Sequence, residues 1–314
     1  MSPAAGSYTA PWWLPGGHLQ TIVAALLPAP RIAWKRERWE TPDGDFIDLD
    51  WAGRDENPCG SLIALFHGLE GSSSSPYSRA IASQALAAGW RCVVPHFRGC
   101  SGELNRLPRA YHSGDSEEIA WVLDLLSRKN EKLLGCGISL GGNALLKYLG
   151  EQGNAASVQK AVAISAPLDL AAAGRNLDAG LSREIYTRIF LRTLKKKTFE
   201  KIRRQRISVD AARLERARTF WEFDDTVTAP RHGFLGADDY WARSSSGPWL
   251  AGIRVPTLVL NARNDPFMPE TALDAIGGTP ANVVLEFPRS GGHAGFPGRD
   301  RWLARRVLEF LSSP

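Results

Sequence analysis

The chain has 314 residues, 44% of them hydrophobic, and its 38 basic and 33 acidic side chains give a net charge of +5 at pH 7. This length suffices for one large core, and single α/β domains of this size are common. So small a charge does not by itself support nucleic-acid binding, and the basic residues lack the interleaved aromatic residues that would stack on bases.

None of the four cysteines forms a Cys-x-x-Cys pair or a metal-ligand spacing: Cys59, Cys92, Cys100 and Cys136. We interpret Cys92 and Cys136, which lie in apolar runs, as small core residues in a reducing compartment. Residues 1–10 lack the charged and apolar regions of a signal peptide, and the apolar run at 22–27 is too short to span a membrane. We therefore expect a soluble, cytoplasmic protein.

The N-terminal arm, about residues 1–30, contains Pro-Trp-Trp-Leu-Pro-Gly-Gly at 11–17 and a short helix predicted to begin near Thr21. Strand-like runs follow at 31–40 and 46–51. The Pro-Asp-Gly sequence at 42–44 predicts that these two runs form an antiparallel hairpin.

Beyond the hairpin, apolar runs alternate with helical patterns. The predicted strands are 61–66, 91–95, a run ending at 138, 161–165, 257–261 and 283–287, and the predicted helices are 76–88, 116–126, 143–149, 269–276 and 301–311. Continuous apolar runs are typical of strands buried on both faces. The alternation therefore predicts one α/β domain over residues 1–314, with a mostly parallel central sheet and helices on both faces.

The stretch Gly-Ile-Ser-Leu-Gly at 137–141 joins a predicted strand to a predicted helix. This is the context of a nucleophile elbow, a turn so tight that the serine has a positive φ and its neighbours must be small. The elbow predicts that Ser139 is a catalytic nucleophile and that the architecture is the α/β-hydrolase fold.

A serine hydroxyl needs a base to take its proton, and the base needs a third group to hold it. His293 follows the last predicted strand and Asp265 follows the strand before it, so both should meet Ser139 at the carboxyl edge of the sheet. The sequence thus predicts a Ser139–His293–Asp265 triad. It leaves Asp169 open as the alternative acid, Asp265 as a turn residue and His293 as an exposed loop residue.

An oxyanion hole requires two backbone N–H groups aimed at the developing negative charge. We assign one to Leu140, the residue after the nucleophile, and the other to Leu69 in the His-Gly-Leu-Glu-Gly loop at 67–71. His67 itself is interpreted as a residue bonded to loop backbone rather than as a proton carrier.

The remaining polar residues of the strand ends are interpreted as structural, His96, Arg98 and Asp115 among them. The other histidines, His18, His112 and His232, offer no ligand spacing with one another. The sequence therefore predicts neither a metal nor a cofactor.

After Gly180 the alternation breaks for about sixty residues. Residues 183–218 favour helix and carry thirteen basic side chains against four acidic ones, a local charge of +9. Serine hydrolases of this architecture commonly carry a lid after the sixth strand, so we expect a helical lid or cap over about 170–245. A weak contact of this basic lid with anionic lipid is one hypothesis, and a solvated basic face is the other.

Four stretches resemble the YheT-type α/β hydrolases, which are akin to membrane-anchored abhydrolase esterases and lipases of eukaryotes. They are residues 14–21 (Leu-Pro-Gly-Gly-His-Leu-Gln-Thr), 67–71 with Ser-Pro-Tyr at 75–77, 98–102, and 137–142. The resemblance spans about residues 11–311 and implies a hydrolase of carboxylic esters, fatty-acyl esters among them, with Ser139, Asp265 and His293 as the triad. The chain shows no N-terminal membrane anchor, so the membrane location of the eukaryotic members does not carry over.

The leading hypothesis is therefore a serine esterase acting on small-molecule carboxylic esters, medium-chain or fatty-acyl esters included. The alternatives are an acyltransferase with the same triad and a non-catalytic binding protein built on the fold. Substrate, acyl length, lid conformation and oligomeric state are open at this point.

Overall fold

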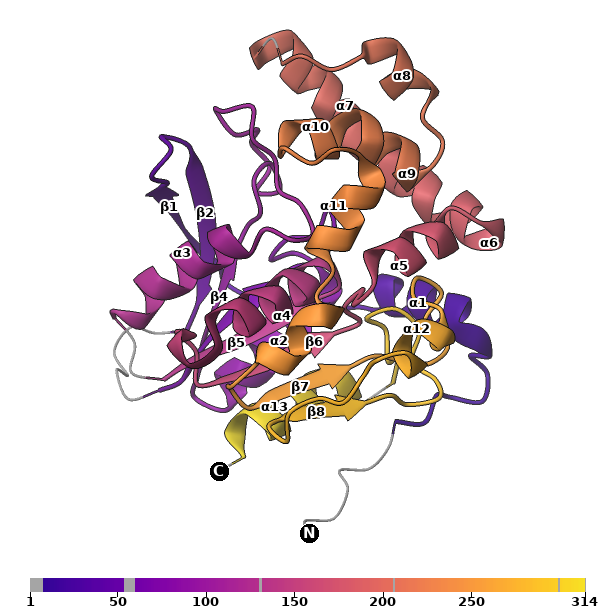
Figure 1. Ribbon diagram of the computed structural model, residues 1–314. Helices are drawn as coiled ribbons and strands as arrows, with labels where there is room; N and C mark the ends of the chain where they lie inside the picture. Colours follow the sequence, from indigo (N-terminus) through magenta and orange to yellow (C-terminus); the bar gives the residue numbers. More distant parts are fainter. Residues whose placement is uncertain (1–7, 54–59, 130–131, 206, 299, 314) are drawn as a thin grey trace.

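The computed structural model describes residues 8–53, 60–129, 132–205, 207–298 and 300–313 (Figure 1). Within them one eight-stranded sheet has the order β1-β2-β4-β3-β5-β6-β7-β8. The pairs β1–β2 and β2–β4 are antiparallel and all others are parallel. The strands are β1 (Lys35–Glu40), β2 (Phe46–Ala52), β3 (Leu62–Phe66), β4 (Arg91–Pro95), β5 (Leu133–Ile138), β6 (Lys160–Ile164), β7 (Thr257–Leu260) and β8 (Val283–Glu286).

The central strands are buried on both faces, as their continuous apolar runs predict. In β3, Leu62, Ala64 and Phe66 belong to the core on one face, while Ile63 and Leu65 belong to the core on the other. This alternation follows from the period of two in a strand.

Helices cover the two faces of the sheet: α3 (Ser116–Ser127) and α4 (Leu140–Gln152) cover the first, and α2 (Pro76–Ala87) and α13 (Trp302–Ser312) the second. The chain therefore has the predicted α/β-hydrolase architecture. The short α12 (Glu270–Asp274) lies between β7 and β8.

Two predicted boundaries near the N-terminus were wrong. The first helix, α1, spans Gly16–Leu26 and so begins five residues before the expected start. Its first turn contains two glycines, which are poor helix formers, so the sequence pattern concealed it. β1 begins at Lys35 rather than 31, because its partner β2 ends at Ala52 and Lys35 pairs with Trp51.

Residues 170–245, which we call the β6–β7 segment, are mostly helical in their described part and lie at one end of the sheet (Figure 1). They comprise α5 (Leu170–Leu177), α6 (Gly180–Ser182), a π-helical turn (Arg183–Thr187), α7 (Arg188–Gln205), α8 (Ala211–Arg216), α9 (Phe220–Phe223), a second π-helical turn (Asp224–Thr228), α10 (Ala229–Arg231) and α11 (Ala237–Ser244). The segment packs around its own small apolar clusters, one centred on Phe220 and Trp241 and one on Leu191 and Leu214.

Across the described ranges, no helix combines the length and apolar content needed to cross a lipid bilayer.

Candidate active site

Ser139 stands on the turn between β5 and α4 with φ 53° and ψ −119°. Its N–H donates to the carbonyl of Ile164 at 2.7 Å, which ties the turn to β6. A Cβ at Gly137 would lie 2.5 Å from the carbonyl oxygen of Gly141, and one at Gly141 would collide with the carbonyl of Phe66. The two glycines are therefore required by close backbone approach, and the left-handed serine has the geometry that the elbow predicts.

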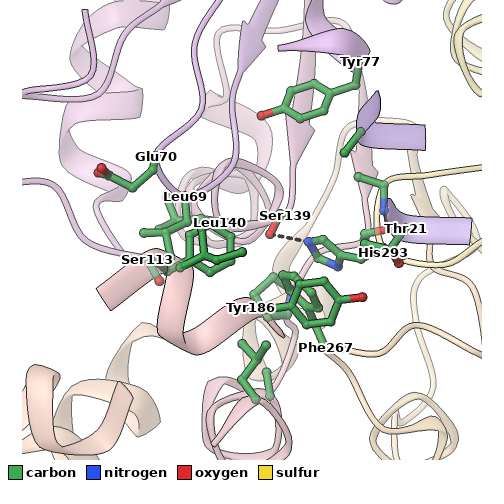
Figure 2. Close-up of a pocket in the computed structure, with 18 of the residues that line it drawn as sticks. Thr21, Leu69, Glu70, Tyr77, Ser113, Ser139, Leu140, Tyr186, Phe267 and His293 are labelled. Atoms are coloured by element: carbon green, nitrogen blue, oxygen red, sulfur yellow. Dashed lines mark hydrogen bonds between the residues drawn. The ribbon is translucent and has the colours of Figure 1, made fainter. Parts of the chain in front are cut away.

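His293 and Asp265 extend this turn into an unbroken hydrogen-bond chain (Figure 2). The Nε2 atom of His293 lies 2.9 Å from Oγ of Ser139, and its Nδ1 lies 2.8 Å from Oδ2 of Asp265. The carboxylate is fully buried, and its Oδ1 accepts the N–H of Phe267 at 2.8 Å. Because a carboxylate only accepts hydrogen bonds, Nδ1 of the neutral imidazole carries the proton. Nε2 therefore presents a lone pair to the serine hydroxyl.

Asp169, the alternative acid that the sequence left open, lies elsewhere, and so does Asp274, which lies within α12. Asp169 caps α5 by accepting the N–H of Ala172 at 2.9 Å. Asp274 pairs with Arg263 at 2.8 Å on the surface. Of these three carboxylates, Asp265 is the one that contacts the imidazole of His293.

Leu69 and Leu140, the two residues predicted to supply the oxyanion hole, lie beside Ser139 (Figure 2). On either side of Leu69 the N–H groups are occupied, because Gly68 donates to Oη of Tyr77 and Glu70 to Oη of Tyr111, each at 3.0 Å. Within the described part of the chain, the N–H of Leu69 itself donates to no protein acceptor. Leu140 opens α4, so its N–H is one of the unbonded donors of a helix N-terminus.

A cavity of about 820 Å³ surrounds these groups, and both Ser139 and His293 line it. Its walls come from α1, α13, the loop after β3 and the β6–β7 segment. Apolar side chains make up much of the lining, including Ala24, Leu27, Phe190, Phe220 and Leu303. The serine hydroxyl thus opens into a largely apolar space of the size typical of small-molecule sites.

A protein-family model described as alpha/beta hydrolase fold matches residues 62–299. YheT of Escherichia coli (strain K12), which carries the provisional name of an esterase, is 38% identical over 310 residues, covering 94% of this chain and 90% of that protein. The chain belongs to the YheT-type α/β-hydrolase family.

Two further similarities agree with this membership. Human phospholipase ABHD3 is 29% identical over 318 residues, which cover 96% of this chain and 77% of that protein. Among solved structures, the esterase EaEST from Exiguobacterium antarcticum superposes with a TM-score of 0.59 at 17% identity, covering 89% of this chain and all of that one. At such identity the structural likeness shows the shared fold alone.

In this α/β-hydrolase chain, sequence reasoning missed the residues that hold the histidine loop. Gln20 accepts the N–H of Gly291 at 2.7 Å, and Thr21 accepts the N–H of His293 at 2.8 Å. Asn264 accepts the N–H of Gly292 at 3.0 Å and donates to Gln20 at 3.0 Å. The sequence motif at 14–21 could have indicated these contacts, because it ends in Gln20 and Thr21, which accept the loop N–H groups.

Two more contacts to this loop could not be predicted from any motif in the sequence. Phe267 stacks on the His293 ring, with centroids 3.8 Å apart and planes 13° from parallel. Ser165, at the end of β6, accepts the N–H of Ala294 at 2.8 Å. Both contacts join residues far apart in the chain, which periodicity cannot pair.

His67 makes the backbone contacts that the sequence suggested. Its Nδ1 lies 2.7 Å from the carbonyl of Gly68, and its Nε2 accepts the N–H of Phe97 at 3.1 Å. The ring is fully buried, and burial lowers its pKa to about 3. The neutral ring therefore holds the Leu69 loop in place and is not available to carry a proton.

The polar residues that the sequence analysis interpreted as structural form pairs with at least one buried member. His96 meets Asp50 at 2.8 Å, Arg98 meets Glu118 at 2.6 Å, and Asp115 meets Arg109 at 2.6 Å. These contacts support the structural interpretation of His96, Arg98 and Asp115.

The rings of His112 and His232 lie 4.5 Å apart, which their spacing in sequence did not indicate. Among the described residues, no group of three or more His, Cys, Asp and Glu side chains could hold a metal ion. Cys92 and Cys136 are buried and unpaired, and Cys59 lies outside the described residues.

Proposed function

We propose that the chain is a serine esterase that cleaves carboxylic esters through Ser139, His293 and Asp265. The observation that carries this proposal is the continuous hydrogen-bond chain from the buried carboxylate through the imidazole to the hydroxyl, at the wall of an apolar cavity. A serine polarised in this way is an activated nucleophile toward an acyl carbonyl.

In the first half-reaction Oγ of Ser139 attacks the carbonyl carbon while Nε2 of His293 takes the hydroxyl proton. Asp265 stays ionised and stabilises the imidazolium. The N–H groups of Leu69 and Leu140 bind the oxyanion, with the N-terminus of α4 adding favourable potential. His293 then gives its proton to the departing alkoxide oxygen, which leaves an acyl-serine and a free alcohol.

In the second half-reaction water replaces the alcohol. Nε2 of His293 takes a proton from the water as its oxygen attacks the acyl-serine, and returns that proton to Oγ as the ester bond breaks. The acid product leaves and Ser139 regains its hydroxyl. An acceptor alcohol in place of water would give acyl transfer, which a product assay with competing alcohol distinguishes.

The apolar lining supports medium-chain or fatty-acyl esters as the substrate class. A relative named a phospholipase supports an acyl ester in general, without fixing the alcohol. The β6–β7 segment supplies Tyr186 and Phe190 to the cavity wall, which supports a lid role for residues 170–245. We place the enzyme in the cytoplasm, because its unpaired cysteines suit a reducing compartment.

A weak contact of the lid with anionic lipid is also proposed, because exposed Leu181 and Ile189 lie among the basic residues of this segment. Flotation with anionic and with zwitterionic liposomes tests it. Equal flotation with both compositions, or none with either, would remove the lipid contact and leave the esterase proposal intact.

The deciding experiment is fluorophosphonate labelling followed by mass-spectrometric mapping of the modified peptide. We expect the wild type and a Ser74→Ala control to be labelled at residue 139, since Ser74 is exposed and distant from the elbow in sequence. Ser139→Ala should remain unlabelled. Equal labelling of Ser139→Ala, or no labelling together with no turnover of p-nitrophenyl esters of several chain lengths, would instead support a non-catalytic binding protein.

A further inference from the structure

An ion pair joins the loop after β3 to the β6–β7 segment. Nζ of Lys197, on α7, lies 2.8 Å from Oε1 of Glu70. The two residues are 127 positions apart in the chain, and both line the cavity. Glu70 directly follows Leu69, whose N–H the proposed mechanism assigns to the oxyanion hole. The ion pair therefore links α7 to a group that takes part in the proposed reaction.

The backbone of Glu70 is left-handed, with φ 56°, a conformation that few residues other than glycine adopt. Such a conformation persists only where the surrounding structure holds the residue firmly. The turn that contains it is closed by a bond of 2.9 Å from the N–H of Gly71 to the carbonyl of Gly68. A contact that anchors the Glu70 side chain therefore helps to keep this turn, and Leu69 within it, in place.

Tyr111 and Glu70 exchange two hydrogen bonds. The N–H of Glu70 donates to Oη of Tyr111 at 3.0 Å, and that hydroxyl donates to Oε1 of Glu70 at 2.9 Å. Burial raises the pKa of Tyr111 well above its ordinary value, so the hydroxyl keeps the proton that it donates. The tyrosine thus connects the carboxylate of residue 70 to the backbone of the same residue.

Lys197 supplies the positive charge that this carboxylate faces. The hydroxyl of Tyr111 and, at 3.9 Å, the weakly donating Sγ of Cys100 also contact Oε1, but neither is a cation. Only 10% of the Glu70 side chain is exposed, so water can replace little of what the ammonium provides. A carboxylate left in such a place without its cation is costly. Loss of Lys197 should therefore turn Glu70 toward solvent and release its left-handed backbone.

The contacts of this turn leave one donor unbonded beside the nucleophile. Gly68 and Glu70 donate to tyrosine hydroxyls, whereas the N–H of Leu69 has no protein acceptor among the described residues. Figure 2 shows Leu69 beside Ser139 and Leu140. The same view shows the carboxylate of Glu70 directed away from Ser139. The carboxylate is therefore suited to act on the site through the backbone that it holds, not by contact with the ester.

We propose that Lys197 is a positioning residue for the oxyanion hole: through Glu70 it fixes the orientation of the Leu69 N–H. This inference rests on the proposed esterase function and gives α7 a part in the reaction besides forming the cavity wall. A displaced N–H stabilises the oxyanion less, whereas the bound ester in its ground state makes little use of it. Loss of the ion pair should therefore lower kcat and leave KM almost unchanged.

A double-mutant cycle with p-nitrophenyl butyrate tests the proposal. We expect Lys197→Met to lower kcat about tenfold, less than the roughly 10²–10³-fold loss on removing an oxyanion-hole donor. Glu70→Gln should also lower kcat, and the double variant should be no slower than the slower single variant, because Lys197 acts through Glu70. Lys197→Arg keeps the charge and should restore most of the rate. Lys196→Met is the matched control, because Lys196 is the exposed neighbour on α7.

Inhibition by 1,1,1-trifluorodecan-2-one adds a readout that a loss of packing alone would not move. Oγ of Ser139 adds to the ketone carbon while His293 takes the hydroxyl proton, and the ketone oxygen becomes an oxyanion in the hole. In Lys197→Met the inhibition constant should rise by the same factor by which kcat falls. Lys197→Arg should return it toward the wild-type value.

Two kinetic results would overturn the proposal. One is a Lys197→Met protein of normal thermal stability that keeps the wild-type kcat, or whose loss multiplies with that of Glu70→Gln in the double variant. The other is a rise in KM with kcat unchanged, which would mean that Lys197 contacts the ester itself.

Hydrogen exchange separates this inference from the esterase proposal, because it needs no turnover. Mass spectrometry of the peptide covering 67–71, on Ser139→Ala, should show faster exchange of the Glu70 amide when Lys197→Met is added, and no change when Lys196→Met is added. Unchanged exchange in both would reject the positioning role even if the wild type hydrolyses esters. Faster exchange in the first, with a wild type that hydrolyses none, would support the hold of Lys197 on the loop and reject the esterase proposal alone.

Discussion

The carboxyl edge of the sheet and the β6–β7 segment contribute to the cavity in opposite ways. At the edge, the reacting groups and their loop are held by hydrogen bonds: the Asp265 carboxylate is fully buried and bonded, and Thr21 and Gln20 hold the histidine loop. The described part of the β6–β7 segment contains two π-helical turns, and buried nitrogens of Arg231 and His232 there have no hydrogen-bond partner. The contrast teaches that the reacting groups are held in place by hydrogen bonds, whereas part of the cavity wall comes from a segment that leaves buried donors unpaired.

If that contrast is right, Asp265→Asn should cause the largest loss of rate. Oδ1 is held by the N–H of Phe267, so the new amide would present its NH2 to Nδ1 of His293 and favour the wrong tautomer. We expect kcat to fall by about 10³–10⁴-fold, the scale for a mis-oriented triad imidazole.

The matched control is Asp169→Asn, which keeps an exposed cap of α5 and should leave kcat unchanged. Steady-state hydrolysis of p-nitrophenyl butyrate measures both variants. A greater loss in Asp169→Asn would return the acid role to the other candidate that the sequence left open.

Gly17→Ala tests whether α1 helps to hold the reacting groups in position. A Cβ at this position would collide with the carbonyl oxygen of Asn264, one residue before Asp265, so α1 or that loop must shift. We expect kcat to fall about 10²-fold, since a displacement near 1 Å is costly for positioned groups. Gly277→Ala is the control, because a Cβ there meets nothing within 4 Å. Equal kinetics for the two variants would show that α1 tolerates movement.

Asp224→Asn tests the β6–β7 segment through the pH dependence of the free energy of unfolding. Burial raises the pKa of this carboxyl from 3.8 to about 7, so between those values the folded chain holds a proton that the unfolded chain has released. Unfolding then releases a proton and becomes easier as the pH rises, by roughly 1 kcal/mol per pH unit.

Urea unfolding of wild type and Asp224→Asn between pH 5 and 7 measures this effect as a difference in slope. We expect the variant to lose less stability than the wild type as the pH rises, by about 2 kcal/mol over the range. Parallel curves for the two proteins would mean that the carboxyl titrates near its ordinary value.

Thr21→Val should have the smallest effect on rate. It removes the acceptor for the His293 N–H while keeping the volume of the side chain, which leaves that donor unpaired. We expect kcat to fall about tenfold, equivalent to the 1–3 kcal/mol of an unmet buried group. Thr193→Val, which removes a hydroxyl bonded to the carbonyl of Phe190 on exposed α7, is the control. A loss in the control as large as in Thr21→Val would indicate a general cost of the substitution.

Local patterns in the sequence determined the strands, the face-covering helices and the turn at Ser139. Each of these depends on residues close together in the chain: alternating or continuous apolar runs, and glycines two positions either side of a serine. The same reasoning placed Asp265 and His293 at one edge of the sheet, because parallel strands end there. Their catalytic roles stay predictions until the variants above are measured.

Only the tertiary structure decided which carboxylate faces the imidazole and why the 14–21 motif ends in Gln-Thr. Those contacts join residues separated by as many as 272 positions, such as Thr21 and His293. A periodic pattern reports which face of an element is buried but not which distant side chain lies against it. Pairing across such separations is set by how the elements pack, and so it had to be read from the folded chain.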